Sequence, residues 1–451
     1  MSLLAATLIA STAMAADETA STTEKGAEYA GISNIKVSGD AKLNYATWDG
    51  SNDEKLFDQP TAAGQVGASV GITADLTEGV SAGVTMNGLS SLGLENNLVG
   101  NVWEGTTANT AKGAVGPAAV AGLKDQFWFS NAWIAGTTGK TTGKIGRMEL
   151  DTPLVFSETW SMYANTFEAA VLVNQDLPGT TLVGAYVGGS NGSEGGSIGD
   201  QNVAGTRENI SYGGVLAGGQ DNANSAFHSF YEGAYTIGAV NNSWEPLKVQ
   251  AWYFQAQHLL NTYWLQADLS MMGLELGGQF VGLNESDSLT GRSTTAGAGK
   301  IGYTMKDTFS ISGAFSKTGK RNTAIQVGGN LAASGQSKLY TEAWWNYGYI
   351  TKAETTAVNI TATTPEEITW VGLGAYITQA TTKDEVTKNS AEVVDGTLLE
   401  VTLEATKKVG PVDISVYYIL TDANTDNIKK GDDNDAGKSY NTVQAYLTYA
   451  F

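Results

Sequence analysis

Apolar and polar side chains alternate with a period of two along much of this chain, and this pattern constrains the fold most. In Ile35–Thr47 mostly apolar residues occupy the odd positions and Lys, Ser, Asp and Asn the even ones. The same alternation covers Met272–Phe280, Phe309–Ser316, Leu399–Thr406 and Val412–Leu420. Successive side chains of a β-strand point to opposite faces, so each segment predicts an amphipathic strand. Strands that cross a membrane have a similar length, about 9–11 residues.

The connections between these segments fall into two sizes. The short ones are Asp75–Glu78, Met305–Thr308 and Lys408–Pro411. The long ones, rich in Gly, Asn and Asp, include Gly188–Arg207, Lys317–Lys338 and Thr421–Ser439. Outer-membrane barrels are built with short periplasmic turns and longer extracellular loops. The split therefore favours a barrel over a soluble β-sandwich.

A helical membrane protein is excluded by the hydropathy of the chain. Beyond residue 16 there is no apolar run of about 18 residues, and polar residues interrupt the most aromatic segment, Val249–Leu269. Strands can cross lipid only as a closed barrel, because every backbone group must be paired there. From Ile35 to Phe451, at roughly 22–24 residues per strand with its connection, we expect an antiparallel barrel of about 18 strands with a wet lumen. Sixteen strands with longer loops are the alternative.

The last segment carries a second barrel signature. Val443, Ala445, Leu447, Tyr449 and Phe451 alternate with polar or amphipathic residues, and the sequence stops at Phe451. An amphipathic strand that closes on an aromatic residue, with another aromatic two positions earlier, resembles the signal read by barrel-assembly machinery. Leu447, Tyr449 and Phe451 are the predicted assembly signal.

The N-terminus predicts export. Leu3–Ala16 is uncharged and mostly apolar, and Ala13-Met14-Ala15 has the small-x-small pattern of a cleavage site. No Lys or Arg precedes the apolar run, so either the start lies further upstream or this segment is not a signal peptide. The predicted organisation is a signal peptide (1–16), an N-terminal extension (17–34) and a transmembrane barrel (35–451).

Composition removes several classes of function. With 26 basic and 46 acidic residues the net charge is −20, which argues against a nucleic-acid partner. The absence of Cys and the presence of only two His leave no plausible zinc or iron set. Gly188–Gly192 matches Gly-x-Ser-x-Gly, but it lies in a polar loop and not at a strand-to-helix turn. We therefore expect neither enzymatic activity nor a cofactor.

One acidic loop could bind calcium through oxygen ligands. Its carboxylates are Asp422, Asp426, Asp432, Asp433 and Asp435. Their spacing does not match a helix-loop-helix calcium site, so a solvated loop is the favoured interpretation.

Two segments carry a family resemblance. Lys144–Leu154, followed by Asn165–Ala169, resembles the Gly-Arg…Thr-Pro…Thr-Phe-Glu block of the outer membrane porin D family and of related epsilonproteobacterial major outer membrane proteins. Trp252–Asp268 is similar to an aromatic-rich hairpin of the same group. The resemblance implies an 18-stranded barrel whose third extracellular loop folds inward as a constriction. A line of Arg along the channel, known in the family, is doubtful in a chain with so few Arg.

The inward loop is expected around Asp151–Asn165. The residues predicted to line the constriction are Lys144, Arg147, Glu149, Asp151 and Glu158. If Ile145 faces lipid, strict alternation turns Arg147 outward as well, unless a bulge at Gly146 or an early strand end intervenes. The sequence leaves these alternatives open.

Charged residues at polar-face positions of the strands are expected to face the lumen. They are Lys36, Asp40, Lys42, Glu275, Glu400, Glu404 and Asp413. Charge sets selectivity where a pore is narrow, so the excess of carboxylates predicts a preference for cations, reduced wherever a carboxylate pairs with a lysine.

The predicted function is an outer-membrane channel for passive diffusion of ions and small hydrophilic solutes. Its expected partners are outer-membrane lipid, lipopolysaccharide, barrel-assembly machinery and, through the family resemblance, further copies in a homotrimer. One alternative is a substrate-specific channel for small acids, amino acids or peptides. Another is a surface adhesin or structural protein whose plugged barrel serves as an anchor.

Overall fold

A computed structural model describes residues 31–49, 55–90, 92–94, 98–99, 126–158, 162–190, 228–321, 323, 325–331, 336–385, 393–425 and 439–451. These residues form eighteen β-strands. The strands are β1 (Ser33–Trp48), β2 (Ala62–Thr77), β3 (Val80–Ser90), β4 (Gln126–Thr138), β5 (Thr141–Met148), β6 (Phe167–Asn174), β7 (Thr180–Ser190), β8 (His228–Trp244), β9 (Leu247–Ala256), β10 (Leu260–Met271), β11 (Leu274–Glu285), β12 (Ser293–Met305), β13 (Phe309–Thr318), β14 (Thr356–Thr364), β15 (Gly372–Glu385), β16 (Val393–Val409), β17 (Val412–Thr425) and β18 (Tyr440–Ala450). In the described connections the named short helices are η1 (Gln59–Thr61), η4 (Tyr349–Thr351) and α3 (Glu366–Thr369).

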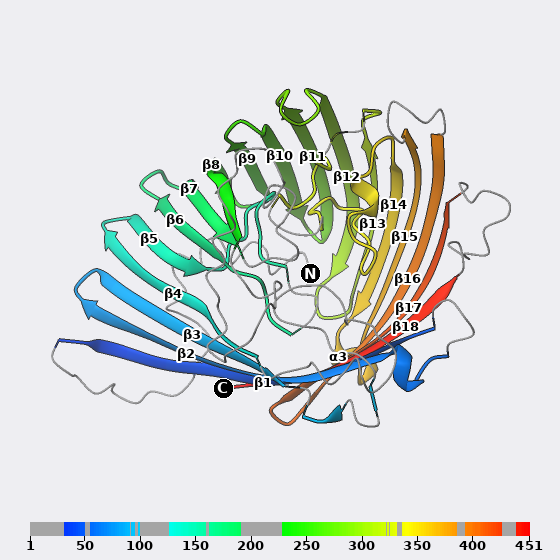
Figure 1. Ribbon diagram of the computed structural model, residues 1–451, viewed down its shortest axis with the longest axis horizontal. Coiled ribbons are helices and arrows are strands. Elements are labelled where there is room, and N and C mark those ends of the chain that lie inside the picture. The colour runs from blue at the N-terminus through cyan, green and yellow to red at the C-terminus, as the bar shows by residue number, and fades with distance from the viewer. Residues whose placement is uncertain are drawn as a thin grey trace.

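The strands close into one barrel (Figure 1). Each strand pairs antiparallel with the next in sequence, and β1 pairs antiparallel with β18 from Asp40↔Ala450 to Trp48↔Thr442. This pairing leaves no open edge, as backbone in lipid requires. The predicted closed antiparallel transmembrane barrel is confirmed, with 18 strands and not 16.

The two ends of the barrel differ in their connections. At one end the turns are short, as at Gly139-Lys140 between β4 and β5 or Met272-Gly273 between β10 and β11. At the other end most connections are longer, including residues 149–166 between β5 and β6 and 319–355 between β13 and β14. The split expected from the sequence is therefore present, although residues 257–259 make a short turn at the long-loop end.

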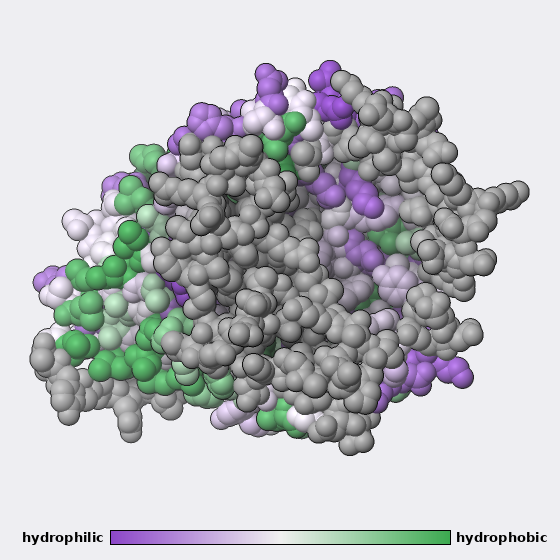
Figure 2. Space-filling view, viewed as in Figure 1, coloured by the Kyte–Doolittle hydropathy of each residue, from purple (hydrophilic) through white to green (hydrophobic). Residues whose placement is uncertain are grey.

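The apolar face of the wall points outward. Val37, Ile145, Ile237 and Ile301 have 59–65% of their surface exposed, as expected where lipid covers the outer face. Figure 2 shows hydrophobic residues gathered over β2–β5 and hydrophilic residues at the upper edge of the molecule. Within the described ranges, no helix is long and apolar enough to cross a membrane.

The closing seam joins the predicted assembly signal to β1. The backbone N–H of Phe451 donates to the Gly39 carbonyl at 2.9 Å, and Gly39 N–H donates back to the Phe451 carbonyl at 2.9 Å. A Cβ at position 39 would lie 2.7 Å from the Phe451 ring, so any residue larger than glycine would clash with this ring. Leu447, Tyr449 and Phe451 all lie on the outer face and are 38–57% exposed.

Some predictions concern residues outside the described part of the chain. The signal peptide (1–16) and nearly all of the extension (17–34) fall there, and so do Asp426, Asp432, Asp433 and Asp435 of the acidic loop. They stay predictions.

Candidate pore constriction

The connection between β5 and β6, residues 149–166, folds into the barrel. Leu150, Leu154 and Val155 are at most 6% exposed and belong to the same apolar cluster as inward wall residues such as Trp252 and Val281. A polar loop outside the barrel would not bury such side chains. The inward loop implied by the family resemblance is therefore present in the fold.

The far part of this loop reaches the wall at β1, four strands away from β5. Tyr163 Oη donates to Asp40 Oδ1 at 3.0 Å, and Lys42 Nζ donates to the Met162 carbonyl at 3.2 Å. Lys42 Nζ also lies 4.8 Å from the centre of the Tyr163 ring. Gly67 on β2 leaves room for this contact, because a Cβ there would come within 2.9 Å of the Tyr163 side chain. The loop therefore lies inside the barrel along the wall between β5 and β1.

A second loop, residues 319–355 between β13 and β14, folds inward and meets the first. Leu331 N–H donates to the Leu154 carbonyl at 2.8 Å. The side-chain amide of Asn330 donates to the Phe156 carbonyl and to Glu158 Oε1, both at 2.8 Å. Asn330 is 1% exposed, so this contact is a buried junction between the two loops.

An ion pair joins the loops at a second point, between Lys338 Nζ and Asp151 Oδ1. The Lys338 carbonyl accepts a hydrogen bond of 2.9 Å from Gln279 on β11, and Tyr340 Oη donates to Asp268 on β10 at 2.5 Å. Burial lowers the pKa of Lys338, while Asp151 acts in the opposite direction. The second loop is thus tied to both the first loop and the wall.

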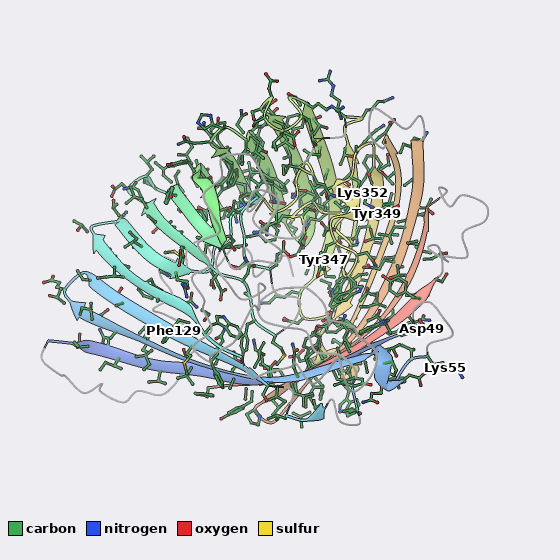
Figure 3. The ribbon with its side chains drawn as sticks, in the orientation of Figure 1. Asp49, Lys55, Phe129, Tyr347, Tyr349 and Lys352 are labelled. Carbon is green, nitrogen blue, oxygen red and sulfur yellow. The ribbon has the colours of Figure 1, made fainter. Side chains whose placement is uncertain are left out.

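Glu400 on β16 anchors the same loop at another part of the wall, two strands beyond β14. Its carboxylate accepts hydrogen bonds from the backbone N–H groups of Trp344, Trp345 and Asn346 at 2.6, 3.0 and 2.7 Å, and from the Asn346 amide at 2.8 Å. Glu400 is 1% exposed. Beyond this anchor, Tyr347 points toward the middle of the barrel and Tyr349 lies nearer the wall (Figure 3).

Two loop carboxylates have strongly raised pKa values. Burial raises the pKa of Glu158 to about 7, against the opposing hydrogen bonds from Asn330 and the Gln336 backbone. Burial also raises the pKa of Glu342 to about 8, although the backbone N–H groups of Ser337 and Gly348 donate to it at 2.7 and 3.1 Å. Near neutral pH both groups are partly protonated, so each carries less than a full negative charge.

The five predicted constriction residues are not all brought together. Glu149 lies where Lys42, Lys144 and Asp151 act on its charge, and burial raises its pKa. Lys144 Nζ lies 4.2 Å from the centre of the Trp133 ring. Asp151 pairs with Lys338 of the second loop. Glu158 is 3% exposed and lies at the junction of the loops.

Arg147 lies apart from this group, on the outer side of the wall. The register of β5 against β4 is continuous through Gly146, so Arg147 shares the face of Ile145, which is 59% exposed. Arg147 donates to Glu168 Oε1 and to the Phe129 carbonyl, both at 2.9 Å. Strict alternation, the first alternative left open by the sequence, therefore describes this strand, and Arg147 does not face the loop carboxylates.

Several wall charges expected in the lumen have oppositely charged partners. Asp40 Oδ2 lies 3.6 Å from Lys42 Nζ on the same strand. Glu275 pairs with Lys300 at 3.0 Å and accepts a hydrogen bond from Thr304. Such pairs reduce the net field of the wall.

The remaining predicted charges differ in environment. Asp413 pairs with Lys408 at 3.1 Å near the short turn between β16 and β17, and its side chain is 58% exposed. Lys36 is exposed near the start of β1. Glu404 accepts a hydrogen bond of 2.6 Å from Tyr376 Oη. Of these three, Glu404 lies closest in sequence to the Glu400 anchor, two strand repeats away on the same face of β16.

Aromatic side chains gather around Glu404 on inward positions of β15, β17 and β18. The Trp344 ring of the second loop lies 4.4 Å from the Tyr417 ring at an interplanar angle of 33°. Tyr417 in turn meets Tyr446 edge to face, with ring centres 6.0 Å apart. Together with Tyr376, these rings form an aromatic wall beside the Glu404 carboxylate.

Sequence reasoning missed the second loop and this aromatic wall. Lys317–Lys338 reads as a polar connection, yet the loop it begins contains Ile325, Val327 and Leu331, each at most 4% exposed. Apolar residues within a segment rich in Gly, Asn and Ser could have indicated that the loop folds inward, because a fully solvated loop would expose them to water.

No metal site is found in the part of the chain that the structure describes. There, no three His, Asp or Glu side chains lie close enough together to hold an ion. Of the five carboxylates of the acidic loop, Asp422 alone belongs to the described residues.

Comparison with known proteins places the fold. No protein-family model and no curated protein matches the chain. Among solved structures, OccK9 (OpdG) of Pseudomonas aeruginosa matches with a TM-score of 0.63 at 14% identity, covering 93% of this chain and 98% of that one. OccAB2 of Acinetobacter baumannii matches with a TM-score of 0.63 at 14% identity over 94% and 99%. A BenF-like porin of Pseudomonas fluorescens matches with a TM-score of 0.64 at 10% identity over 93% and 98%. The chain therefore has the barrel fold of these porins, which agrees with the porin D resemblance read from its sequence.

Proposed function

We propose that the protein is an outer-membrane porin, a water-filled channel for passive diffusion of ions and small hydrophilic solutes. The observation that supports this most is the pair of loops that meet inside a closed barrel. They narrow the lumen, while inward charged side chains of the wall, such as Asp40, Lys42 and Glu275, keep 20–24% of their surface exposed. A narrow, polar, fixed passage is what a diffusion pore requires.

We further propose a modest preference for cations. Three carboxylates, Asp40, Asp151 and Glu275, have a lysine partner. The residual field then depends on Glu149 and Glu404, with Lys144 opposing them. This balance favours cations less strongly than the net charge of −20 suggests, because paired charges cancel at a distance.

The test is ion current through the purified protein in a planar lipid bilayer with a salt gradient. Stepwise conductance with a weakly cation-selective reversal potential is the expected result, and Glu149→Gln should shift that potential toward anions. Asp413→Asn is the matched control, because it removes the same charge near an exposed turn, away from the loops. Anion selectivity would overturn the charge assignment. No conductance from a folded barrel would favour the anchor or adhesin alternative.

A substrate-specific channel is the second candidate, and the aromatic wall favours it. Aromatic faces beside a carboxylate attract cationic solutes through cation–π and ionic contacts. Basic amino acids are therefore the substrates we would test first. Arginine in the millimolar range should interrupt the single-channel current in a saturable way, and Tyr417→Leu should weaken the block. Equal block by arginine and glycine would remove this candidate.

The location and assembly of the protein are also proposals. Signal-peptide cleavage after residue 16, delivery by barrel-assembly machinery through Leu447, Tyr449 and Phe451, contact with lipopolysaccharide and assembly as a homotrimer all fit the barrel. Fractionation of cells expressing the full chain, followed by N-terminal sequencing and native gel electrophoresis, tests each point separately.

A further inference from the structure

A cavity of about 330 Å³ lies at the long-loop end of β10–β13. Its lining includes Tyr263, Asn284, Thr294, Thr295, Lys320 and Arg321. The cavity is separate from the loop junction at Asn330 and has no part in the proposed conduction path.

The residues around this cavity lie at the edge of the apolar outer face of β10 and β11. Tyr263 alternates with Trp264, which is fully buried, and therefore shares the outer face with Leu265, which is 47% exposed. The Tyr263 ring lies 6.0 Å from that of Phe280, which is 43% exposed. The ring covers Gly282, where a Cβ would come within 2.2 Å of it. Lipid on the outer face thus adjoins the cavity.

Positive charge is concentrated around the cavity in a chain that is acidic overall. Arg321 is exposed, and the Lys320 side chain is 81% exposed. Lys317, two residues before Gly319, shares the outer face of β13 with Phe315. Glu354 lies 3.4 Å from Lys320 Nζ and offsets one of these positive charges, so Lys317, Lys320 and Arg321 together still leave the rim of the cavity positive.

Nearby acidic groups do not cancel this charge. Glu285 is 7% exposed and accepts hydrogen bonds from Thr290 and from the Ile325 backbone at 2.7 Å, so it is engaged with the second loop. Asp287 is exposed in the turn before Arg292. The backbone beside the cations is fixed, because Gly319 N–H donates to the Thr295 carbonyl at 2.7 Å.

Polar side chains line the cavity beside the cations. Asn284 and Thr295 lie on the same outer face as Tyr263, and both belong to the lining. The Asn284 amide donates to Asn261 Oδ1 at 3.0 Å, which holds the Asn284 side chain in place.

We infer that this cavity binds the phosphorylated sugar headgroup of a glycolipid in the outer leaflet. Arg321 and Lys320 would bind a phosphate, as guanidinium and ammonium groups do, Asn284 and Thr295 would bind sugar hydroxyls, and the acyl chains would run along Phe280 and Leu265. The volume is at the small end of the range for ligand pockets, about 300–1,000 Å³, which suits one phosphorylated sugar. This inference rests on the proposed outer-membrane location.

Native mass spectrometry of the detergent-purified full chain tests the site, with diphosphoryl lipid A as the probe. Wild type should retain lipid A, and the double variant Lys320→Gln/Arg321→Gln should bind it roughly tenfold more weakly, a loss of about 1.4 kcal/mol. Lys407→Gln/Lys408→Gln is the matched control, since it removes two adjacent cations at the other end of the barrel and should bind normally. Tyr263→Leu keeps every charge and should also weaken binding.

Two further ligands separate the sources of the phosphate. Inorganic phosphate at equal concentration should not displace lipid A, and phosphatidylglycerol should bind more weakly than lipid A. Equal loss in the Lys320/Arg321 variant and the control, displacement by free phosphate, or equal retention of phosphatidylglycerol would overturn the inference. Lipid A retention and ion conductance are measured separately on the same folded barrel, so a failure of the lipid site is distinguishable from a failure of the porin function.

Discussion

Removing the Glu400 carboxylate should release the second loop into the lumen. In Glu400→Ala the backbone N–H groups of Trp344, Trp345 and Asn346 lose their acceptor. One hydrogen bond to a charged group contributes about 1.5–3 kcal/mol. Because four such bonds share one carboxylate, the total is less than their sum, and we take about 3–6 kcal/mol. At about 1.4 kcal/mol per tenfold change, the ratio of displaced to packed loop rises by about 10²–10⁴.

Single-channel recording is the assay for this displacement. We expect Glu400→Ala to show stronger open-channel noise and an altered conductance, because residues 344–346 no longer hold one position. Limited proteolysis should then cut within residues 319–355, which wild type protects. The barrel should still form, since the substitution leaves the backbone pairing of β16 in place.

Glu404→Ala is the control. It removes the same side chain from the same face of β16, but the partner lost is Tyr376 on the neighbouring strand. Its current noise should stay close to wild type. If Glu400→Ala is folded and as quiet and protease-resistant as Glu404→Ala, then Glu400 does not hold the loop and the reasoning fails.

Three further predictions concern other parts of the barrel. Burial raises the pKa of Glu342 to about 8, so the packed loop binds more protons than a displaced, solvated loop. The stability of the packed loop should therefore fall as pH rises from about 4.5 to 8. Current noise in wild type should increase over that range, and a pH-independent trace would contradict this. Lys144→Gln should increase cation selectivity in a reversal-potential measurement, whereas Arg147→Gln, which removes an outward charge, should leave it unchanged; equal shifts would place both in the lumen. Gly39→Val should lower the yield of heat-modifiable barrel on gels by displacing the Phe451 ring, and an unchanged yield would show that the seam tolerates a side chain there.

Much of the fold follows from local pattern. Period-two alternation fixes which face of each strand meets lipid, so the sequence of Ile35–Thr47 alone orients β1. The same rule predicts that Arg147 and Ile145 share a face, and the continuous register through Gly146 agrees with it. Lipid imposes these features residue by residue, which makes them readable without any tertiary information.

The interior of the lumen could not be read in this way. Whether residues 319–355 fold inward depends on contacts between positions far apart in sequence, such as Asn330 with Glu158 and Glu400 with Trp344. The burial of Glu158 has the same origin, because its neighbours come from another loop. No local periodicity encodes such pairings, and the sequence analysis therefore predicted one inward loop where the described residues form two.

The pairing of β1 with β18 also sets the order of events in biogenesis. The first strand to leave the ribosome finds its second partner only when the last strand has been made, since Asp40 pairs with Ala450. Until then β1 has one exposed edge, with unpaired N–H and C=O groups that invite aggregation. The ring therefore cannot close before β18 has been made, and until then the edge of β1 has to be kept from pairing with other chains.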